Sequence, residues 1–384
     1  MPHNSSSHFV SPKTAACLIG GIALAAAGTM AGVILHGKAR ARAFSNLATP
    51  VFPIPGLDEG FVPQDLTLIK DFDCTTPKTT PEESTKAKNR SKSALKPSAK
   101  IPFHTDFAGK LAQDKSATWI LSGYSADGGP SPLYVCPPEQ SPRRLKVKLC
   151  DGSLYRGHGA AVTVWGNNVY LTTDDGYLVL DRRDVLKAAD AAEVYALHHV
   201  SLPLQPAFMI AQAGKLYVGE YYFPIAYETP ASHHLTAPDG THNPALIFEF
   251  DADPHTLSGF STTPTCAYSI PKEIQGMCCT AQGHIVLSQS FGVGDSHILV
   301  FDQGHATSPD TFTYTPDCQI PLYYFDSGNI IASIPAIPMT EGLALDGNTI
   351  FILDESASKR YLLGRFFKGD QVWALHVPLP KEVF

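Results

Sequence analysis

The stretch TEGLALDGNTIFILDESA at residues 340–357 shows the pattern that decides the fold. A polar pair opens it, a short apolar run follows, and a turn of Asp, Gly and Asn leads into a second apolar run that ends in acidic residues. Short runs rich in β-branched and aromatic residues, bounded by turn residues, are typical of paired antiparallel strands. The stretch therefore predicts two strands, with polar side chains gathered at one end of the pair.

The same pattern occurs five times, and a third and a fourth apolar run follow each pair. The first runs lie at 61–69, 156–164, 204–211, 274–281 and 340–347, and the second runs at 117–125, 168–176, 215–223, 284–292 and 349–357. The third runs are SPLYVCP, YLVLD, ALIFEFD, HILVFD and RYLLGRF, and the fourth are RLKVKLC, EVYALHHV, TCAYSI, NIIASIPAI and QVWALHVPL. Four short strands in a constant order are typical of one blade of a β-propeller. We predict an all-β propeller of four-stranded blades over 60–384, with five blades visible and a sixth that insertions could hide.

Three insertions interrupt the repeat. The first, at 72–115, separates the first two strands of the first unit, and its part at 75–105 is basic and nearly without apolar residues. Such a segment cannot bury enough apolar surface to offset the entropy lost on ordering, so we expect a disordered surface loop there. Two shorter insertions lie at 222–244 and 303–327.

A charge-free apolar segment at 15–35 precedes the repeat and is long enough to cross about 30 Å of hydrocarbon as a helix. It predicts an uncleaved membrane anchor or a cleaved signal peptide, with an arm at 1–14 before it and a tether at 36–59 after it. The basic residues that follow the segment favour a cytoplasmic body. The β-rich composition and the seven cysteines of the body favour export, so we expect a membrane-anchored body outside the cytoplasm, or a secreted one.

The charge distribution excludes one class of partner. Residues 1–105 hold 12 Lys and Arg against 7 Asp and Glu, which leaves 17 against 29, a net charge of −12, for residues 106–384. A body this acidic does not suit binding to nucleic acid. The sequence also lacks the glycine-rich phosphate loop, the dinucleotide fingerprint, the zincin motif and the serine-hydrolase elbow.

Polar residues recur at two positions of the repeat, which a propeller would bring to one face around its central channel. The starts of the first strands carry Gln64, His158, Gln205, Gln275 and Glu341, and the ends of the second strands carry Tyr124, Asp127, Asp174, Glu220, Tyr221, Gln289, Asp354 and Glu355. Loops on a rigid scaffold are common places for binding residues. We therefore predict a ligand-binding mouth made of these two rings.

Three uses of this mouth remain open. The polar side chains could bond to one another and to channel water. They could also hold a hard cation such as Ca²⁺, which takes six to eight oxygen ligands, with Glu341 and Glu220 as its carboxylates. A carboxylate of raised pKa could instead act with His158 or Asp354 in general acid–base catalysis.

Several segments resemble parts of uncharacterised secreted bacterial β-propeller proteins: 122–130, 274–276, 285–292, 340–342 and 354–356. More distantly, the chain is similar to the calcium-dependent propellers of the gluconolactonase and strictosidine-synthase-like group. In that group a Glu-Gly at the start of an inner strand supplies a metal ligand, and Glu341-Gly342 matches this position. The Asn and Asp that complete the site in that group have no clear counterparts here.

These observations lead to two functional hypotheses. The first is an extracytoplasmic propeller that binds a small molecule, a glycan or a protein at its polar mouth, with Ca²⁺ as a candidate cofactor. The alternative is a metal-dependent hydrolase of the lactonase or esterase kind that uses the same mouth. The membrane is the expected second partner, through residues 15–35.

Overall fold

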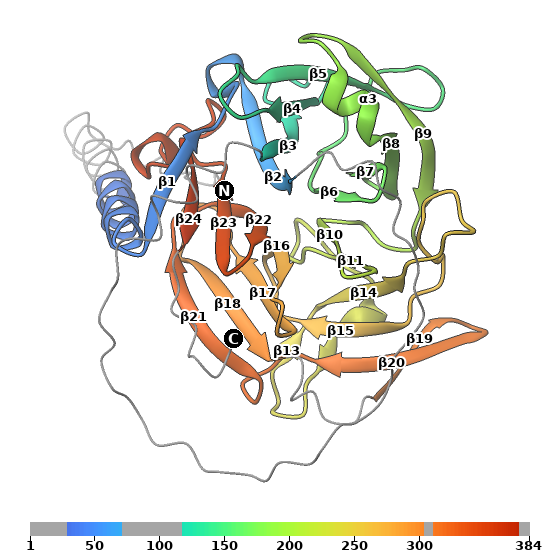
Figure 1. The fold of residues 1–384 in the computed structure, drawn as a ribbon. Helices are drawn as coiled ribbons and strands as arrows, with labels where there is room; N and C mark the ends of the chain where they lie inside the picture. The colour runs from blue at the N-terminus through green and yellow to red at the C-terminus, as the bar shows by residue number, and fades with distance from the viewer. Residues whose placement is uncertain (1–28, 71–116, 303–309, 376–384) are drawn as a thin grey trace, which may run out of the picture.

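The computed structural model describes residues 29–70, 117–302 and 310–375, and these residues form a mostly β, propeller-like body (Figure 1). Its strands pair into five consecutive antiparallel groups of four. The first group is β2 (Phe61–Ile69), β3 (Thr118–Ser125), β4 (Pro132–Cys136) and β5 (Arg143–Lys148), and the second is β6 (Val162–Trp165), β7 (Asn168–Thr173), β8 (Gly176–Asp181) and β9 (Glu193–Ser201). The third is β10 (Phe208–Gln212), β11 (Lys215–Gly219), β14 (Ala245–Asp251) and β15 (Cys266–Ile270). The fourth is β16 (Ile274–Cys279), β17 (His284–Gln289), β18 (Ser296–Asp302) and β21 (Ile330–Ala336), and the fifth is β22 (Thr340–Asp346), β23 (Thr349–Asp354), β24 (Gln371–Leu375) and β1 (Ala48–Pro53).

The first strands of the five groups form a closed ring. Strand β2 contacts β6, β6 contacts β10, β10 contacts β16, β16 contacts β22, and β22 contacts β2 again. In Figure 1 these strands surround the centre of the molecule, and the later strands of each group lie further out. The outermost strands β5 and β9 also pair in parallel, which joins the first two groups into one eight-stranded sheet. The ring brings the starts of five strands, distant in sequence, to one end of a common channel.

The last group differs from the prediction, because its third and fourth strands lie elsewhere in the sequence. The run RYLLGRF at 360–366 is not a strand: it contains a turn and the 3₁₀ helix η4 (Gly364–Phe366). The backbone of Ser356 passes so close to Gly364 that a Cβ there would collide with it. Strand β24 takes the third place, and β1 pairs with it antiparallel from Ala48 opposite Leu375 onward. The first described strand of the chain therefore completes the last group and closes the ring.

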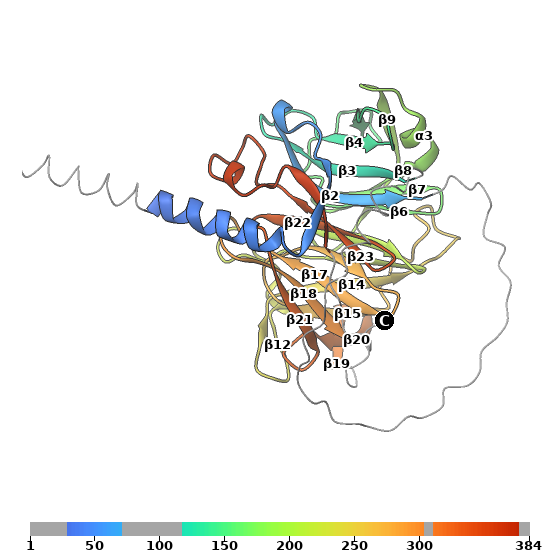
Figure 2. The same ribbon diagram turned by 60° about the vertical axis from the view of Figure 1, so that its left-hand side comes forward.

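The segment 36–59, expected to be a tether, is folded onto the body. A helix that ends at residue 44 leads into β1 and then into the 3₁₀ helix η1 (Leu57–Glu59). Phe44 is buried with its ring 5.8 Å from that of Trp373, and Arg40 donates to the carbonyl oxygen of Ser296 at 2.8 Å. Figure 2 shows the helix leading away from the body beyond these contacts.

The expected membrane segment at 15–35 is described only from residue 29. Within the described ranges, the structure contains no helix that combines the length and the hydrophobicity needed to cross a bilayer. The arm at 1–14 and the basic segment at 75–105 lie outside the described residues.

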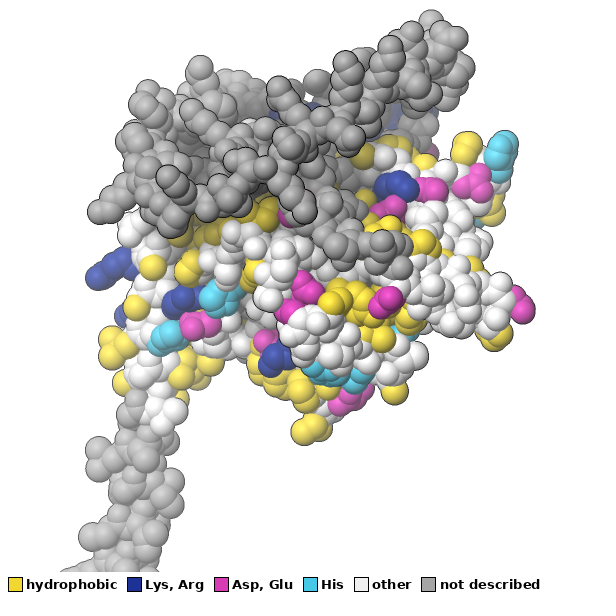
Figure 3. Space-filling view, turned by 90° about the horizontal axis from the view of Figure 1, so that it is seen from below, with side chains coloured by type: hydrophobic (Ala, Val, Ile, Leu, Met, Phe, Trp, Pro, Cys, Tyr) yellow, Lys and Arg dark blue, Asp and Glu magenta, His cyan; other side chains and the backbone are white. Residues whose placement is uncertain are grey.

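The two later insertions add structure around the third group. Residues 222–244 include the 3₁₀ helix η2 (Ala231–His233) and the short pair β12 (Leu235–Thr236) and β13 (His242–Asn243). The hairpin of β19 (Asp310–Thr315) and β20 (Cys318–Tyr324) pairs in parallel with β15, which extends this sheet to six strands. Helix α3 (Arg182–Lys187) connects β8 to β9, with Asp181 as its N-cap. Figure 3 shows that charged side chains of both signs are dispersed among hydrophobic ones on the visible described surface seen from below.

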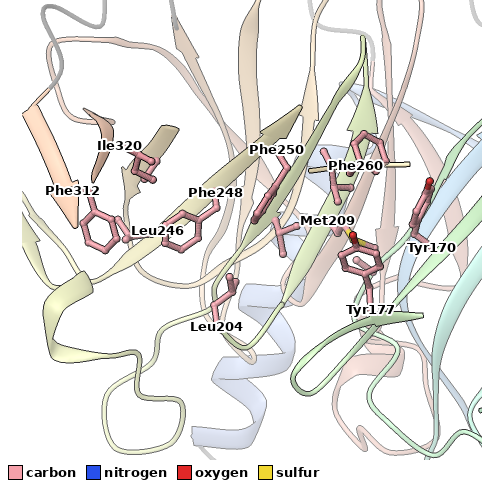
Figure 4. Packing of buried hydrophobic residues seen from close by; sticks show 14 of the residues in the cluster. Tyr170, Tyr177, Leu204, Met209, Leu246, Phe248, Phe250, Phe260, Phe312 and Ile320 are labelled. Atoms are coloured by element: carbon pink, nitrogen blue, oxygen red, sulfur yellow. The ribbon is translucent and has the colours of Figure 1, made fainter. Parts of the chain in front are cut away.

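The groups are held together by apolar side chains between neighbouring sheets. In one cluster, Tyr177, Leu246, Phe248 and Phe260 from the second and third groups are almost completely buried (Figure 4). Truncating one such aromatic residue costs about 3–5 kcal/mol. The adjacent Cys278 and Cys279 of β16 are buried free thiols, and burial raises the pKa of both.

Candidate functional site

A cavity of about 390 Å³ lies at the end of the ring where the first strands begin. Both predicted rings contribute to its lining: the strand starts give Gln64, His158, Gln205, Gln275 and Glu341, and the strand ends give Tyr124, Asp174, Tyr221 and Glu355. Nine of the residues predicted from the repeat therefore lie around one cavity. Further lining side chains are Tyr227, Phe291, Met339, Arg360 and Tyr361.

Irregular pairing aims the polar side chains of the first strands. The register of β2 shifts between Pro63 and Asp65, at Gln64, and the register of β16 shifts between Ile274 and Gly276, at Gln275. In β22 the shift falls between Thr340 and Leu343 and includes Glu341. Such bulges turn a side chain out of the regular alternation and are frequent beside functional sites. Three strands thus break their pairing at the residue that lines the cavity.

Close packing behind these bulges requires glycine. A Cβ on Gly276 would lie 2.7 Å from the carbonyl oxygen of Glu341, and a Cβ on Gly342 would collide with the carboxylate of Asp65. Asp65 is buried and accepts a hydrogen bond from the backbone N–H of Val162 at 2.9 Å, which links β2 to β6. Burial raises the pKa of Asp65 well above its ordinary value. The first strands therefore approach one another too closely at Gly276 and Gly342 for any residue larger than glycine.

Two carboxyl groups meet at the base of the cavity. Glu341 and Glu355 are 3% and 9% exposed, and their side chains lie within hydrogen-bonding reach of each other. Glu355 also accepts from Gln64 Nε2 and from the Tyr361 hydroxyl, each at 2.9 Å. Burial raises the pKa of Glu355 to about 7 and that of Glu341 well above its ordinary value. Two carboxyl groups within hydrogen-bonding reach favour a state in which one of them holds a proton, because ionising both places like charges close together.

One wall of the cavity stacks aromatic rings beneath a cation. The ring of Tyr124 lies 4.4 Å from that of His158, and its hydroxyl lies 3.5 Å from that of Tyr361. The Arg360 guanidinium carbon is 5.2 Å from the centre of the Tyr124 ring and 6.0 Å from that of Tyr361. Desolvation, followed by the charge of Arg360, lowers the pKa of His158. Burial raises the pKa of Tyr124 to about 12.

The opposite wall is also aromatic. Tyr221 and Tyr227 pack edge to face with their ring centres 5.4 Å apart, and Phe291 stacks on Phe223 at 3.5 Å. Tyr227 and Phe223 belong to the insertion at 222–244, so this insertion helps to form the site. The cavity therefore has an acidic base between two aromatic walls.

Four predicted residues, Glu220 among them, lie outside the cavity lining. Asp354 is 0% exposed and accepts from the backbone N–H of Ser356 at 2.7 Å, and burial raises its pKa well above the ordinary value. Asp127 is exposed and stabilises a turn by accepting from the Ser125 hydroxyl and from the backbone N–H of Gly129. Gln289 donates to the backbone carbonyl of Lys272 at 2.9 Å.

Glu220 is not brought to Glu341, although we expected both to hold a metal. It is 2% exposed and binds His233 Nδ1 at 2.8 Å and the backbone N–H of Leu246 at 3.1 Å, and it does not line the cavity. In the described parts of the chain, no cluster of three or more His, Cys, Asp or Glu is arranged to hold a metal ion.

Sequence reasoning missed Arg360 and Tyr361. Both were assigned to a strand of the last unit, whereas the structure places them in the connection between β23 and β24, where they reach the cavity. The sequence did hold one indication of their position. The connection between the acidic pair at 354–355 and the apolar run at 371–375 is longer than a tight turn between two paired strands requires, which indicates a loop there.

Comparisons with known proteins give only distant similarities. No protein-family model matches the chain, and no curated protein matches its sequence. Among solved structures, it is similar to glutaminyl cyclase from Myxococcus xanthus, at 11% identity and a TM-score of 0.33 over 67% of this chain and 85% of that one. It is also similar to the PQQ-bound aldose sugar dehydrogenase from Streptomyces coelicolor (10% identity, TM-score 0.33, 66% of this chain and 90% of that one). A putative oxidoreductase, described as a glucose dehydrogenase, from Thermus thermophilus gives 10% identity and a TM-score of 0.35 over 67% of this chain and 93% of that one.

Proposed function

We propose that the protein is a five-bladed β-propeller that binds a small molecule in the cavity above Glu341 and Glu355. The convergence of both polar rings on one cavity carries this proposal. Its volume, about 390 Å³, lies in the range of small-molecule sites, which combine apolar and aromatic walls with a few directed polar groups. A cavity of this size suits a small molecule or a single sugar ring better than the surface of a protein.

We also propose that the body functions outside the cytoplasm. The support is the apolar segment at 15–35, as an anchor or a signal, followed by a β-rich acidic body. In this arrangement the cavity would sample ligands on the outer side of the membrane.

An acid–base hydrolase is the second candidate, and the carboxyl pair favours it. A carboxyl group with a pKa of about 7 is suited to proton transfer near neutral pH. Glycoside hydrolysis is a poor match, because its two carboxyl groups stand about 5–9.5 Å apart, farther than a hydrogen-bonded pair. The metal-assisted form has less support than a metal-free one, since His233 engages Glu220.

A thermal melt of the full chain against a chemically diverse set of small molecules tests the binding proposal. A ligand of the folded state stabilises it by about 2.7 kcal/mol at 100 times its Kd. The variant Gln275→Trp should fill the cavity and abolish the shift, while Gln289→Trp, the same change outside the cavity lining, should keep it. Equal shifts in both variants would place the ligand elsewhere. Parallel melts with EDTA and with Ca²⁺ test whether a metal contributes.

A further inference from the structure

The charged groups of the cavity are unequal in number. Two buried carboxyl groups, Glu341 and Glu355, and the exposed Asp174 line it, together with the guanidinium group of Arg360. A proton held by the buried pair limits that pair to a single negative charge, which Arg360 offsets. If this proton left, the buried part of the site would gain a negative charge in a place where burial makes such a charge costly.

We propose that the ligand of this cavity is a small protonated amine, and that its ammonium group replaces the proton shared by Glu341 and Glu355. This inference rests on the binding function proposed above and specifies its ligand. The exchange leaves the net charge of the buried pair and its ligand unchanged, because one proton leaves as one ammonium group enters. The proton is released to solvent, and no covalent bond forms.

The hydrogen-bonding groups at the base match an ammonium group. An ammonium group has three N–H donors and no acceptor. Glu341 and Glu355 supply acceptor oxygens, and Gln64 and Gln275, whose amides carry further acceptor oxygens, also line the cavity. Gln64 already donates to Glu355 with its amide nitrogen, so its oxygen remains to accept. A neutral alcohol could bond here too, but it would leave the shared proton in place.

The walls also suit a cation with an apolar body. Arg360 shows this directly, because its guanidinium group rests over the rings of Tyr124 and Tyr361. Aromatic faces attract cations through their quadrupole, more strongly where water is excluded. Tyr221, Tyr227 and Phe291 form the other wall, against which an apolar or aromatic substituent would pack.

A divalent metal ion fits this base less well. Ca²⁺ requires six to eight oxygen ligands, more than the carboxyl groups of Glu341 and Glu355 supply. The carboxylate of Glu220, which could have added to such a set, is held by His233.

The exchange predicts a pH dependence that originates in the pair. Burial raises the pKa of Glu355 to about 7, whereas the pKa of His158 is lowered and the pKa values of Tyr124 and Tyr361 are raised. Asp65 and Asp354 approach the pair from β2 and β23, and both also have raised pKa values, but neither lines the cavity. Asp174 lines the rim and is exposed.

Three probes of similar shape test the inference: phenethylammonium, 2-phenylethanol and 3-phenylpropanoate. Calorimetry of the full chain, in buffers with different ionisation enthalpies, measures affinity and proton release together. We expect phenethylammonium to bind with proton release at pH 6, and its affinity to rise with pH up to about pH 7. The alcohol should bind at least about tenfold more weakly, without proton release, and the carboxylate more weakly still.

Variants of Glu341 and Glu355 test whether these two carboxyl groups are the source of the released proton. Glu341→Gln and Glu355→Gln should each abolish proton release and flatten the pH dependence, while Asp127→Asn, which removes an exposed carboxylate outside the cavity, should match the wild type. Melting curves first establish that each variant is folded, and either variant of the pair alone is sufficient for the test.

The outcomes separate this inference from the binding function. Equal affinity for the amine and the alcohol, or amine binding without proton release, would overturn the inference and leave a cavity that binds neutral molecules. Failure of all three probes at millimolar concentration would also overturn it. The binding function itself fails only if no compound in the diverse set gives a melt shift that Gln275→Trp removes.

Discussion

Glu220 and Glu355 occupy the same position of the repeat but have different surroundings. Each directly follows the last residue of a second strand, Gly219 in β11 and Asp354 in β23, and each is at most 9% exposed. Glu220 binds the imidazole of His233 and a backbone N–H, while Glu355 faces a second carboxyl group in a cavity. The partner, and not the position in the repeat, decides whether a buried carboxylate serves the fold or remains open to a ligand.

The largest effect is expected from removing the partner of Glu220. His233→Leu keeps the volume of the side chain but leaves the carboxylate without its imidazole donor, so the free energy of unfolding should fall by about 3–5 kcal/mol. Urea denaturation at pH 7 measures this loss. His233→Gln, which retains a donor, should lose much less. If both variants are as stable as the wild type, Glu220 is not a structural anion and the contrast with Glu355 fails.

Replacing Glu355 should have the opposite effect and raise the stability of the protein at high pH. The pKa of Glu355 in the folded protein, about 7, lies above its ordinary value of 4.5. The contribution of the protonated group to the free energy of unfolding is therefore complete below pH 4.5 and is lost as the pH rises through 7. At pH 8 this loss amounts to about 3 kcal/mol. Glu355→Gln should remove most of this pH dependence and should be more stable than the wild type at pH 8. Urea midpoints at pH 5 and pH 8 give the comparison, and a variant that is less stable at both would contradict it.

A smaller effect should follow from Gly342→Ala, which tests the packing behind the pair. The new Cβ would displace the carboxylate of Asp65 and weaken its bond to Val162, at a cost of about 1–3 kcal/mol. Gly32→Ala adds the same atom in open space on the N-terminal helix and should cost nothing. Thermal melts compare the stability of the two variants. Equal melting temperatures would mean that the strands around Gly342 can move apart to accommodate the new Cβ, contrary to the prediction.

The smallest effect concerns the hydroxyl group of Tyr361. Its hydrogen bond to Glu355 stabilises the ionised carboxylate, so Tyr361→Phe should raise the pKa of Glu355 further, by an amount equivalent to about 1 kcal/mol. Carbon-13 NMR titration of the glutamate carboxyl groups detects the shift. Tyr324→Phe, whose hydroxyl donates to the exposed Asp310, should leave that titration unchanged.

The repeat in the sequence predicted most of the strands, because each apolar run is short, β-branched and bounded by turn residues. It failed in the last group, where an apolar run at 360–366 has the composition of a strand but forms a turn and a 3₁₀ helix, while β24 pairs with β23. The strand that completes this group, β1, lies at the other end of the described chain, and pairing over that distance leaves no local signal.

The same reasoning explains what could be predicted of the site. Gln64, Gln275 and Glu341 were found because a polar residue interrupts an apolar strand at each position. The different roles of Glu220 and Glu355 could not be predicted, because the partner of Glu220 comes from an insertion whose path the repeat does not determine. The proximity of Glu341 and Glu355 likewise depends on the irregular pairing of β22 with β23, which sequence spacing alone does not give.

The pairing of β1 with β24 has a consequence for synthesis. A ribosome delivers β1 before any of the ring and β24 after nearly all of it, so β1 must wait without its partner while the other groups assemble. An unpaired strand exposes a row of hydrogen-bonding groups that can join the wrong neighbour. Completion of the body is therefore a late, non-local event, and a nascent chain that stops short of residue 371 would present an open edge on both sides of the gap.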